Sequence, residues 1–299
     1  MLDNKLSGEQ NVMTTYLTNN VSWHADFIAT LSGDESEIDL RTWVTIHNAS
    51  GKTYTDSKVS LVSGQVNRVS NVVVTGVQPF QADRRMSLAK AESSMGLPTR
   101  QDFFEYHEYD VNGRTTLRDN EQKQLKLMEA LHIDVEKSYV LRSEALRHQM
   151  SDPVEHKFDV VLKFENDTQQ PLPAGRIRVF KANSQGSPQL AGEDRIGHVP
   201  VDDEVEITLG KAFDLTAEKR QTEFRRVGDR ALEIGHRVVV QNHKDEPVVV
   251  HLHEKIHGDW RVVKESHKGE KTDSSTLAYT LSLGKSERQT VTYSVRLRW

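Results

Sequence analysis

The feature that most constrains this chain is an alternation of apolar and polar residues with a period of two. In the segment EIDLRTWVTIHN, residues 37–48, the side chains of Ile38, Leu40, Val44 and Ile46 fall on one face. The same pattern recurs in HKFDVVLKFEN, HRVVVQN, VVVHLHE, STLAYTLSL and QTVTYSVRLRW. Successive side chains of a strand point to opposite faces, so this alternation predicts half-buried strands. Turn residues between the segments favour an all-β fold of two antiparallel β-sandwich-like units with little helix.

Three stretches bear on how the chain is organised. Pro153 and its polar neighbours lie between two strand-rich halves, which predicts units of residues 1–150 and 151–299. Gly96, Pro98 and several serines predict a flexible loop over residues 84–101. Residues 119–131 stay ambiguous between helix and strand, because their leucines fit both periods.

Composition limits the possible functions. The net charge of -5 and the pI of about 6.2 argue against a nucleic-acid-binding protein, which needs a basic field. The absence of cysteine excludes disulfides and thiolate chemistry. No apolar stretch approaches the roughly 20 residues of a membrane-spanning helix. The start of the chain lacks the pattern of a signal peptide, so we expect a cytoplasmic protein, or a periplasmic or cell-envelope protein whose signal peptide has been trimmed.

A short sequence recurs three times: an alternating strand that ends in asparagine and is followed by small polar residues. The asparagines are Asn48, Asn166 and Asn242. Asparagine tolerates left-handed backbone angles and closes Asx-turns, so we interpret the three as structural corners between strands. Two alternatives remain: the first two lie in glycosylation sequons, NAS and NDT, and the three loops together could form a ligand site.

The order of several longer segments points to a known family. The segments YLTNNVSWHADF, DLRTWVTIHNASGKTYTDSKVSLVSGQVNRV, PLPAGRIRVF, GEDRIGH, RQTEFRRVGDRA and QNHKDEPVVVHLHEKIHGDWRVV resemble a bacterial family of unknown function. Its domain forms the C-terminal half of mucoidy-inhibitor-A-like proteins, which commonly carry a signal peptide. The resemblance covers nearly the whole chain and implies a protein of the cell envelope. It implies no catalytic residues, because the family has no established activity.

Histidines form the densest cluster of chemically active side chains. His251, His253 and His257 alternate with the apolar residues Val250 and Leu252, so they should share the opposite face of one strand. Two imidazoles in a His-x-His pair can bind one metal ion, with His257 or His243 as a third ligand. The competing interpretation is a solvated face. In that case all thirteen histidines would titrate near 6.5, turn the net charge positive in mild acid and strengthen binding to an anionic polysaccharide.

Glu254 lies in the apolar row of the same strand. A carboxylate in a core needs a partner, and we expect an arginine, with Arg195, Arg237 and Arg261 as candidates. The catalytic alternative, a general acid with a raised pKa, needs a second carboxylate facing it.

Trp43 is the best candidate for a carbohydrate platform, because it should face away from the apolar row of its strand. Taken together, these patterns predict a non-enzymatic module of the cell envelope that acts in binding or assembly, with no cofactor and with a polysaccharide or protein as partner. The alternatives are a carbohydrate-binding β-sandwich that uses an exposed tryptophan, and a histidine-ligated, metal-dependent hydrolase.

Overall fold

The computed structural model describes residues 13–63, 107–145, 148–150 and 152–298, and all regular structure in these ranges is strand. The prediction of an all-β fold with two sandwich-like units is confirmed. No helix occurs in the described part of the chain, so none there could cross a membrane. The loop predicted at 84–101 lies outside the described residues.

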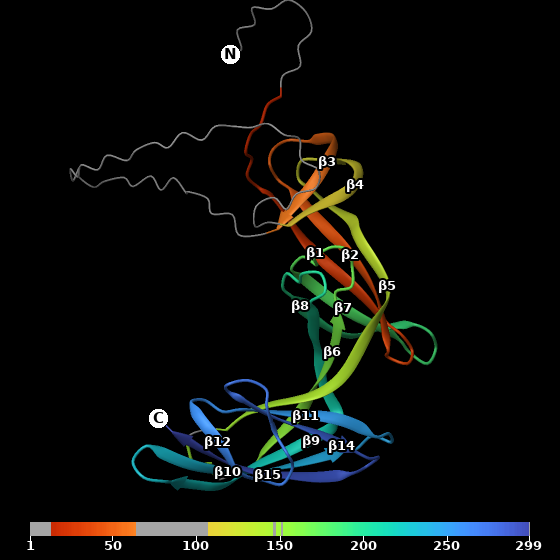
Figure 1. Cartoon of the computed structure of the whole chain (residues 1–299). Helices are drawn as coiled ribbons and strands as arrows, with labels where there is room; N and C mark the ends of the chain where they lie inside the picture. Colours follow the sequence, from red (N-terminus) through yellow and green to blue (C-terminus); the bar gives the residue numbers. More distant parts are fainter. Residues whose placement is uncertain (1–12, 64–106, 146–147, 151, 299) are drawn as a thin grey trace, which may run out of the picture.

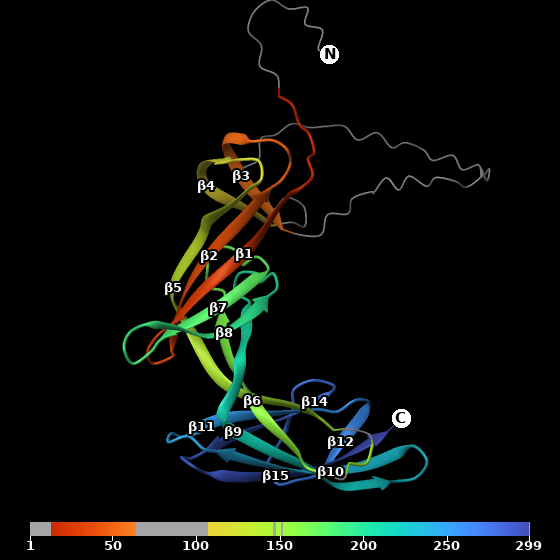
Figure 2. The same cartoon turned by 180° about the vertical axis from the view of Figure 1, so that it is seen from behind.

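The molecule is elongated and has two lobes (Figure 1, Figure 2). The N-terminal lobe contains β1 (Val21–Leu31), β2 (Glu37–Asn48), β3 (Tyr54–Ser63), β4 (His107–Leu117), β7 (Gly175–Ala182) and β8 (Pro188–Ile196). The C-terminal lobe contains β10 (Ala231–Asn242), β11 (Val248–Lys255), β12 (Asp259–Glu265), β13 (Glu270–Lys271), β14 (Thr276–Leu283) and β15 (Arg288–Arg298). The strands β5 (Glu121–Glu144), β6 (Val154–Glu165) and β9 (Glu204–Arg226) run from one lobe into the other.

Each lobe has its own hydrophobic core, and the long strands contribute to both. On β5, Ile133 is buried in the core of the N-terminal lobe and Leu141 in that of the C-terminal lobe. On β6, Phe164 is buried in the core of the N-terminal lobe and Phe158 in that of the C-terminal lobe. The predicted boundary near residue 150 falls between β5 and β6, whereas the two cores are each built from residues on both sides of it.

The two sheets of the C-terminal lobe arise where β5 and β6 separate. The two strands are paired only from Val135 to Val140. Beyond this point β5 joins β11 and β14 in one layer, while β6 continues into a second layer of order β6–β9–β10–β15–β12. The space between the layers holds the core of this lobe.

Most neighbouring strands are antiparallel, but two pairs are parallel: β1 with β7, and β5 with β11. The partners of each parallel pair are far apart in the sequence, which leaves the long crossover that a parallel pair requires. Local alternation cannot reveal such pairing, because it reports only which face of a strand is buried.

The ambiguous segment 119–131 is strand in the structure, since β5 begins at Glu121. It pairs with β2 over the whole length of that strand, for example Leu125 with Val44. Tertiary pairing with β2 therefore overrides the helical spacing of its leucines.

Candidate functional site

The three asparagine corners share one hydrogen-bonding geometry. Each asparagine ends a strand or directly follows one, and each is fully buried: Asn48 1%, Asn166 0% and Asn242 0% exposed. The side-chain Oδ1 accepts a hydrogen bond from the backbone N–H two residues ahead, and Nδ2 donates to the carbonyl four residues ahead. Nδ2 also donates to a carbonyl in the turn before the returning partner strand, at Arg118, Pro200 or Gly284. Each side chain thus joins its own turn to the turn that starts β5, β9 or β15.

This geometry contradicts the glycosylation alternative. The amide nitrogens of Asn48 and Asn166 are buried and donate to backbone carbonyls. The hydroxyls of Ser50 and Thr168 donate to the asparagine Oδ1 at 2.7 Å. The hydroxyl in each sequon thus takes part in the corner, although the corner at Asn242 has Lys244 in that position and forms without a hydroxyl.

The corners also do not converge on one ligand. Asn48 pairs with Glu121 at the start of β5, whereas Phe164, next to the second corner, pairs with Val135. Fourteen residues of strand separate these positions, which is roughly 45 Å at the usual rise. The third corner lies in the other lobe. The three loops are architectural elements of successive strand pairs.

The partner of Glu254 is Lys219, so the expectation of an arginine was wrong. Glu254 is 1% and Lys219 7% exposed, and the two form an ion pair between the layers of the C-terminal lobe. The arginines cannot reach it: Arg237 and Arg261 project from the outer face of the second layer, and Arg195 belongs to the N-terminal lobe.

Ser143 connects the members of this buried group. Lys219 Nζ donates to Ser143 Oγ at 2.8 Å and to the carbonyl of Glu144 at 3.1 Å, in addition to Glu254. The Ser143 hydroxyl donates in turn to Glu254 at 2.7 Å. A serine activated by a lysine needs an amine that accepts the hydroxyl proton. Here all three amine protons and the hydroxyl proton are already donated, so the arrangement is that of a structural network.

A cavity of about 250 Å³ lies beside this network, lined by Ser143, Lys219, Gln221, His156 and His236 among others. His236 is 1% exposed and stacks on Tyr293 at 5.3 Å, and neither ring nitrogen has a hydrogen-bond partner among the described residues. Burial, and then the charge of Lys219, lower the pKa of His236 to about 4. Burial also lowers the pKa of His156. Both rings are thus neutral near pH 7.

His251 and His253 lie on β11 opposite the buried residues Val248, Val250 and Leu252, as predicted, whereas His257 follows the end of that strand at Lys255. The rings of His251 and His253 are 6.5 Å apart, and His257 lies 3.4 Å from a carboxylate oxygen of Glu144. Within the described ranges, no group of three histidine, aspartate or glutamate side chains could hold a metal ion. This includes the candidate ligands His251, His253, His257 and His243.

The histidines do not titrate together, contrary to the expectation from their number. Burial, followed by the charge of Arg142, lowers the pKa of His253. The hydrogen bond that the His132 ring donates to the Glu37 carboxylate raises the pKa of His132. With His236 near 4, mild acid cannot add thirteen positive charges to the protein.

Trp43 is half-buried on the outer face of the N-terminal sheet, between Asp26 of β1 and Lys126 of β5. Ion pairs surround it: Arg178 contacts Asp26, and Glu129 contacts both Arg41 and Lys126. Its indole is thus available at a charged sheet face, although part of its surface is covered.

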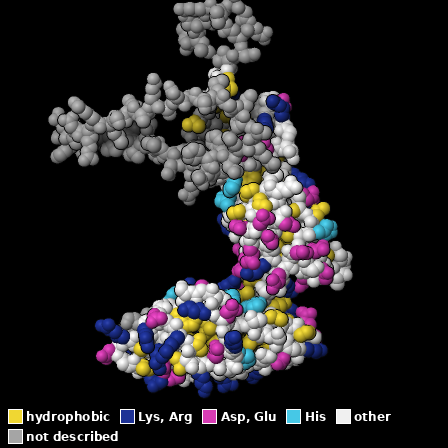
Figure 3. All heavy atoms as spheres, in the orientation of Figure 1, with side chains coloured by type: hydrophobic (Ala, Val, Ile, Leu, Met, Phe, Trp, Pro, Cys, Tyr) yellow, Lys and Arg dark blue, Asp and Glu magenta, His cyan; other side chains and the backbone are white. Residues whose placement is uncertain are grey.

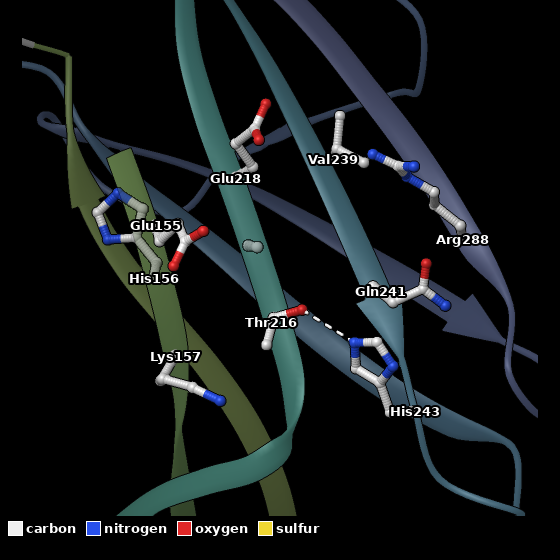
Figure 4. A pocket seen from close by; sticks show the side chains of 10 residues that line it. Glu155, His156, Lys157, Thr216, Glu218, Val239, Gln241, His243 and Arg288 are labelled. Carbon is white, nitrogen blue, oxygen red and sulfur yellow. Dashed lines mark hydrogen bonds between the residues drawn. The ribbon is translucent and has the colours of Figure 1, made fainter. Parts of the chain in front are cut away.

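An open groove of about 440 Å³ lies on the second layer of the C-terminal lobe (Figure 4). Side chains from four strands line it: Glu155, Lys157, Thr216, Glu218, Gln241, His243 and Arg288. Thr216 Oγ1 lies 3.4 Å from His243 Nε2, and Lys157 Nζ donates to the carbonyl of Phe213. The groove therefore offers carboxylate acceptors, cationic donors and a hydroxyl within one ligand-sized space.

The groove and the buried network were both missed at the level of sequence. A signal for the network exists in DLTAEKR, where Lys219 shares its face with Leu215 and Ala217. No signal exists for the groove, because its side chains come from four strands that are distant in sequence.

The fold and these features define a two-lobed, all-β protein with a polar groove on one sheet face and a buried ion pair behind that sheet. Residues 12–299 match the family model described as a domain of unknown function, DUF4139. The chain therefore belongs to this family, and the resemblance to a bacterial domain of unknown function is confirmed. Neither a curated protein nor a solved structure matches the chain.

Proposed function

We propose that this chain is a non-enzymatic binding module of the cell envelope, and that the groove of Figure 4 holds part of a polysaccharide. The observation that carries the proposal is the groove's mixture of acceptors and donors, which combines the carboxylates Glu155 and Glu218 with the cations Lys157 and Arg288. Sugar hydroxyls both donate and accept hydrogen bonds, so they need such a mixture. The envelope location follows from the resemblance to mucoidy-inhibitor-A-like proteins.

The open shape of the groove fits binding better than catalysis. An enzyme site usually excludes water and brings a base or nucleophile to the substrate. The groove lies on an open sheet face, whereas the serine and lysine of the buried network are engaged with each other and with Glu254.

Trp43 supports a second location for the same function. An indole on a sheet face can stack on a sugar ring, and Arg178 and Glu129 beside it could bind hydroxyl groups. The indole is half-buried, and Arg178 and Glu129 beside it already form ion pairs, so we place it second.

Affinity electrophoresis in gels that contain a neutral or an acidic polysaccharide tests the proposal and separates the two locations. Thr216→Val with Glu218→Ala should weaken binding roughly tenfold, since each lost hydrogen bond contributes about 1 kcal/mol or less. The matched control is Thr55→Val with Glu108→Ala, which makes the same chemical changes at exposed positions of the N-terminal lobe.

The outcomes are distinct. A third variant, Trp43→Ala, tests the second location. If it lost binding while the Thr216/Glu218 variant kept it, the site would lie in the N-terminal lobe. If the wild-type protein bound neither the neutral nor the acidic polysaccharide, the proposed function would be wrong.

A further inference from the structure

The outer face of the second layer of the C-terminal lobe carries an excess of positive charge. Across β6, β9, β10, β15 and β12, the outward positions hold nine lysines and arginines but five carboxylates, on a chain whose net charge is -5. Figure 3 shows Lys and Arg side chains crowded at the end of this lobe where β12 and the C-terminus lie. We call the exposed cations of this surface the arginine face: Arg220, Arg237, Arg261, Lys264, Arg288 and Arg298.

These cations are not needed to neutralise the protein's own carboxylates. Within the described ranges, none of the six makes an ion pair. Two other arginines of this surface, Arg225 and Arg296, both contact the buried carboxylate of Glu233, which lies between them on β10. The arginine face is therefore additional charge beyond what the buried carboxylate requires.

Two of these cations lie where their mutual repulsion lowers the stability of the sheet. Arg220 of β9 and Arg237 of β10 are directly opposite each other, and both are exposed. Like charges at directly opposed positions destabilise a sheet. An anionic ligand that contacts both guanidinium groups would remove this repulsion.

The length of the face indicates a polymer. Arg288 lines the groove of Figure 4, and Arg298 lies ten residues further along β15. At the rise of an antiparallel strand this is roughly 34 Å, longer than a single small anion. Thr290, Thr292 and Ser294 project between these arginines and add hydroxyl groups along the path.

We propose that an acidic polysaccharide lies along the arginine face and enters the groove, so that its carboxylates contact Arg220 and Arg237. This inference rests on the proposed function and names its ligand class. The surface fits an acidic sugar polymer better than single-stranded nucleic acid, because the exposed aromatic side chains described on β9, Phe213 and Phe224, are eleven residues apart and offer no continuous platform on which successive bases could stack. It fits a membrane less well, because Val239, the apolar residue next to Arg237 in the outward row of β10, is buried and leaves no apolar side chain between the arginines for insertion into lipid.

The test compares polygalacturonate with the neutral polymer dextran, using the whole chain. Wild-type protein should bind polygalacturonate more tightly than dextran, and raised salt should weaken this preference. Arg220→Gln with Arg237→Gln should lower the affinity for polygalacturonate about thirtyfold, at about fivefold per cation near an anionic surface. The control, Arg114→Gln with Arg118→Gln, makes the same change in net charge at exposed positions of the N-terminal lobe and should leave the affinity unchanged.

Three results would overturn the inference. Equal binding of both polymers would leave the groove as a polysaccharide site and remove the arginine face from it. Equal losses in the Arg220/Arg237 and Arg114/Arg118 variants would show a net-charge effect without a site. Tighter binding of a single-stranded oligonucleotide or of phosphatidylglycerol vesicles, abolished by the Arg220/Arg237 substitutions, would assign the face to that partner. Failure of every polysaccharide to bind would instead refute the proposed function itself.

Discussion

Lys219 and Glu254 reach toward each other from the two layers of the C-terminal lobe and form an ion pair inside its core. The pair is enclosed by β5 on one side, where Ser143 donates to Glu254, and by the ring of His236 on the other side, at the edge of the same cavity. A buried ion pair need not stabilise a fold relative to apolar residues, but the loss of one partner leaves an uncompensated charge. This asymmetry makes the pair testable.

Glu254→Gln should therefore lower the free energy of unfolding by about 3–5 kcal/mol, the range for breaking a buried ion pair. Urea denaturation of the purified protein measures this. The double variant Lys219→Met with Glu254→Leu removes both charges, and we expect it to be more stable than Glu254→Gln alone. If the single variant unfolded at the same urea concentration as wild type, the pair would not be buried in solution.

The asparagine corners should be as sensitive as a core residue. Asn166→Ala removes one acceptor and leaves the carbonyls of Gln170, Val199 and Pro200 without their side-chain donor. The carbonyls of Val199 and Gln170 keep another donor, Leu172 N–H and Thr168 Oγ1, so the cost of about 1–3 kcal/mol for an unsatisfied buried group falls on Pro200. With the other lost hydrogen bonds, we expect a total loss of roughly 2–4 kcal/mol. Asp167→Ala, at the exposed neighbouring position, is the control. Equal stability of the two variants would contradict the structural role of the corner.

These cases show what the sequence can predict. Alternation correctly predicted which residues of β2 and β11 face the core, because side-chain direction depends only on the local chain. The buried position of Glu254 could be predicted in the same way. Its partner could not, because Lys219 comes from another strand and only the packing of two layers brings it close.

The division of the molecule was harder to infer. A turn near Pro153 predicts a boundary, but β5 and β6 on either side of it each cross both cores. The arginine face is a similar case, since the opposition of Arg220 and Arg237 depends on the register of β9 with β10. Register across distant strands is a property of the whole fold.

The pKa of His236 predicts a loss of stability in mild acid. The histidine pKa is about 6.5 when unfolded and about 4 in the folded chain, so between these values the unfolded state binds more protons. The free energy of unfolding should fall as the pH falls from 6.5 toward 4, by up to about 3 kcal/mol from this residue. Below about pH 4 both states are protonated and the contribution of His236 is fully lost.

Urea denaturation across this range, compared with His236→Gln, measures the effect. The variant should show a shallower decline, with the remainder due to His156 and His253, whose pKa values are also lowered. His24→Gln, at an exposed position, should decline as wild type does. The comparison is best made above pH 4.5, because Glu35 adds its own acid sensitivity below this value. Burial raises the pKa of Glu35, but its contacts with Lys137 and Lys181 together lower it further, so the net pKa is lowered. Parallel curves for wild type and His236→Gln would show that His236 is not buried in neutral form.

The opposed arginines predict a gain in stability that accompanies a loss of binding. Arg220→Gln removes a like-charge cross-strand contact with Arg237, and both side chains are exposed, so no packing is lost. We expect the free energy of unfolding to rise by a few tenths of a kcal/mol, and by at most about 1 kcal/mol, because opposed side-chain pairs contribute energies of this size. Arg296→Gln should instead lower the free energy of unfolding, because Arg296 contacts the buried carboxylate of Glu233. The hydrogen bond from Arg296 is the largest cause of the lowered pKa of that carboxylate. Thermal and urea unfolding at low salt distinguish the two, since screening weakens the repulsion at high salt. If the Arg220→Gln protein were less stable than wild type, Arg220 would stabilise the sheet. Its repulsion with Arg237 would then no longer support the binding of an anionic ligand at this pair.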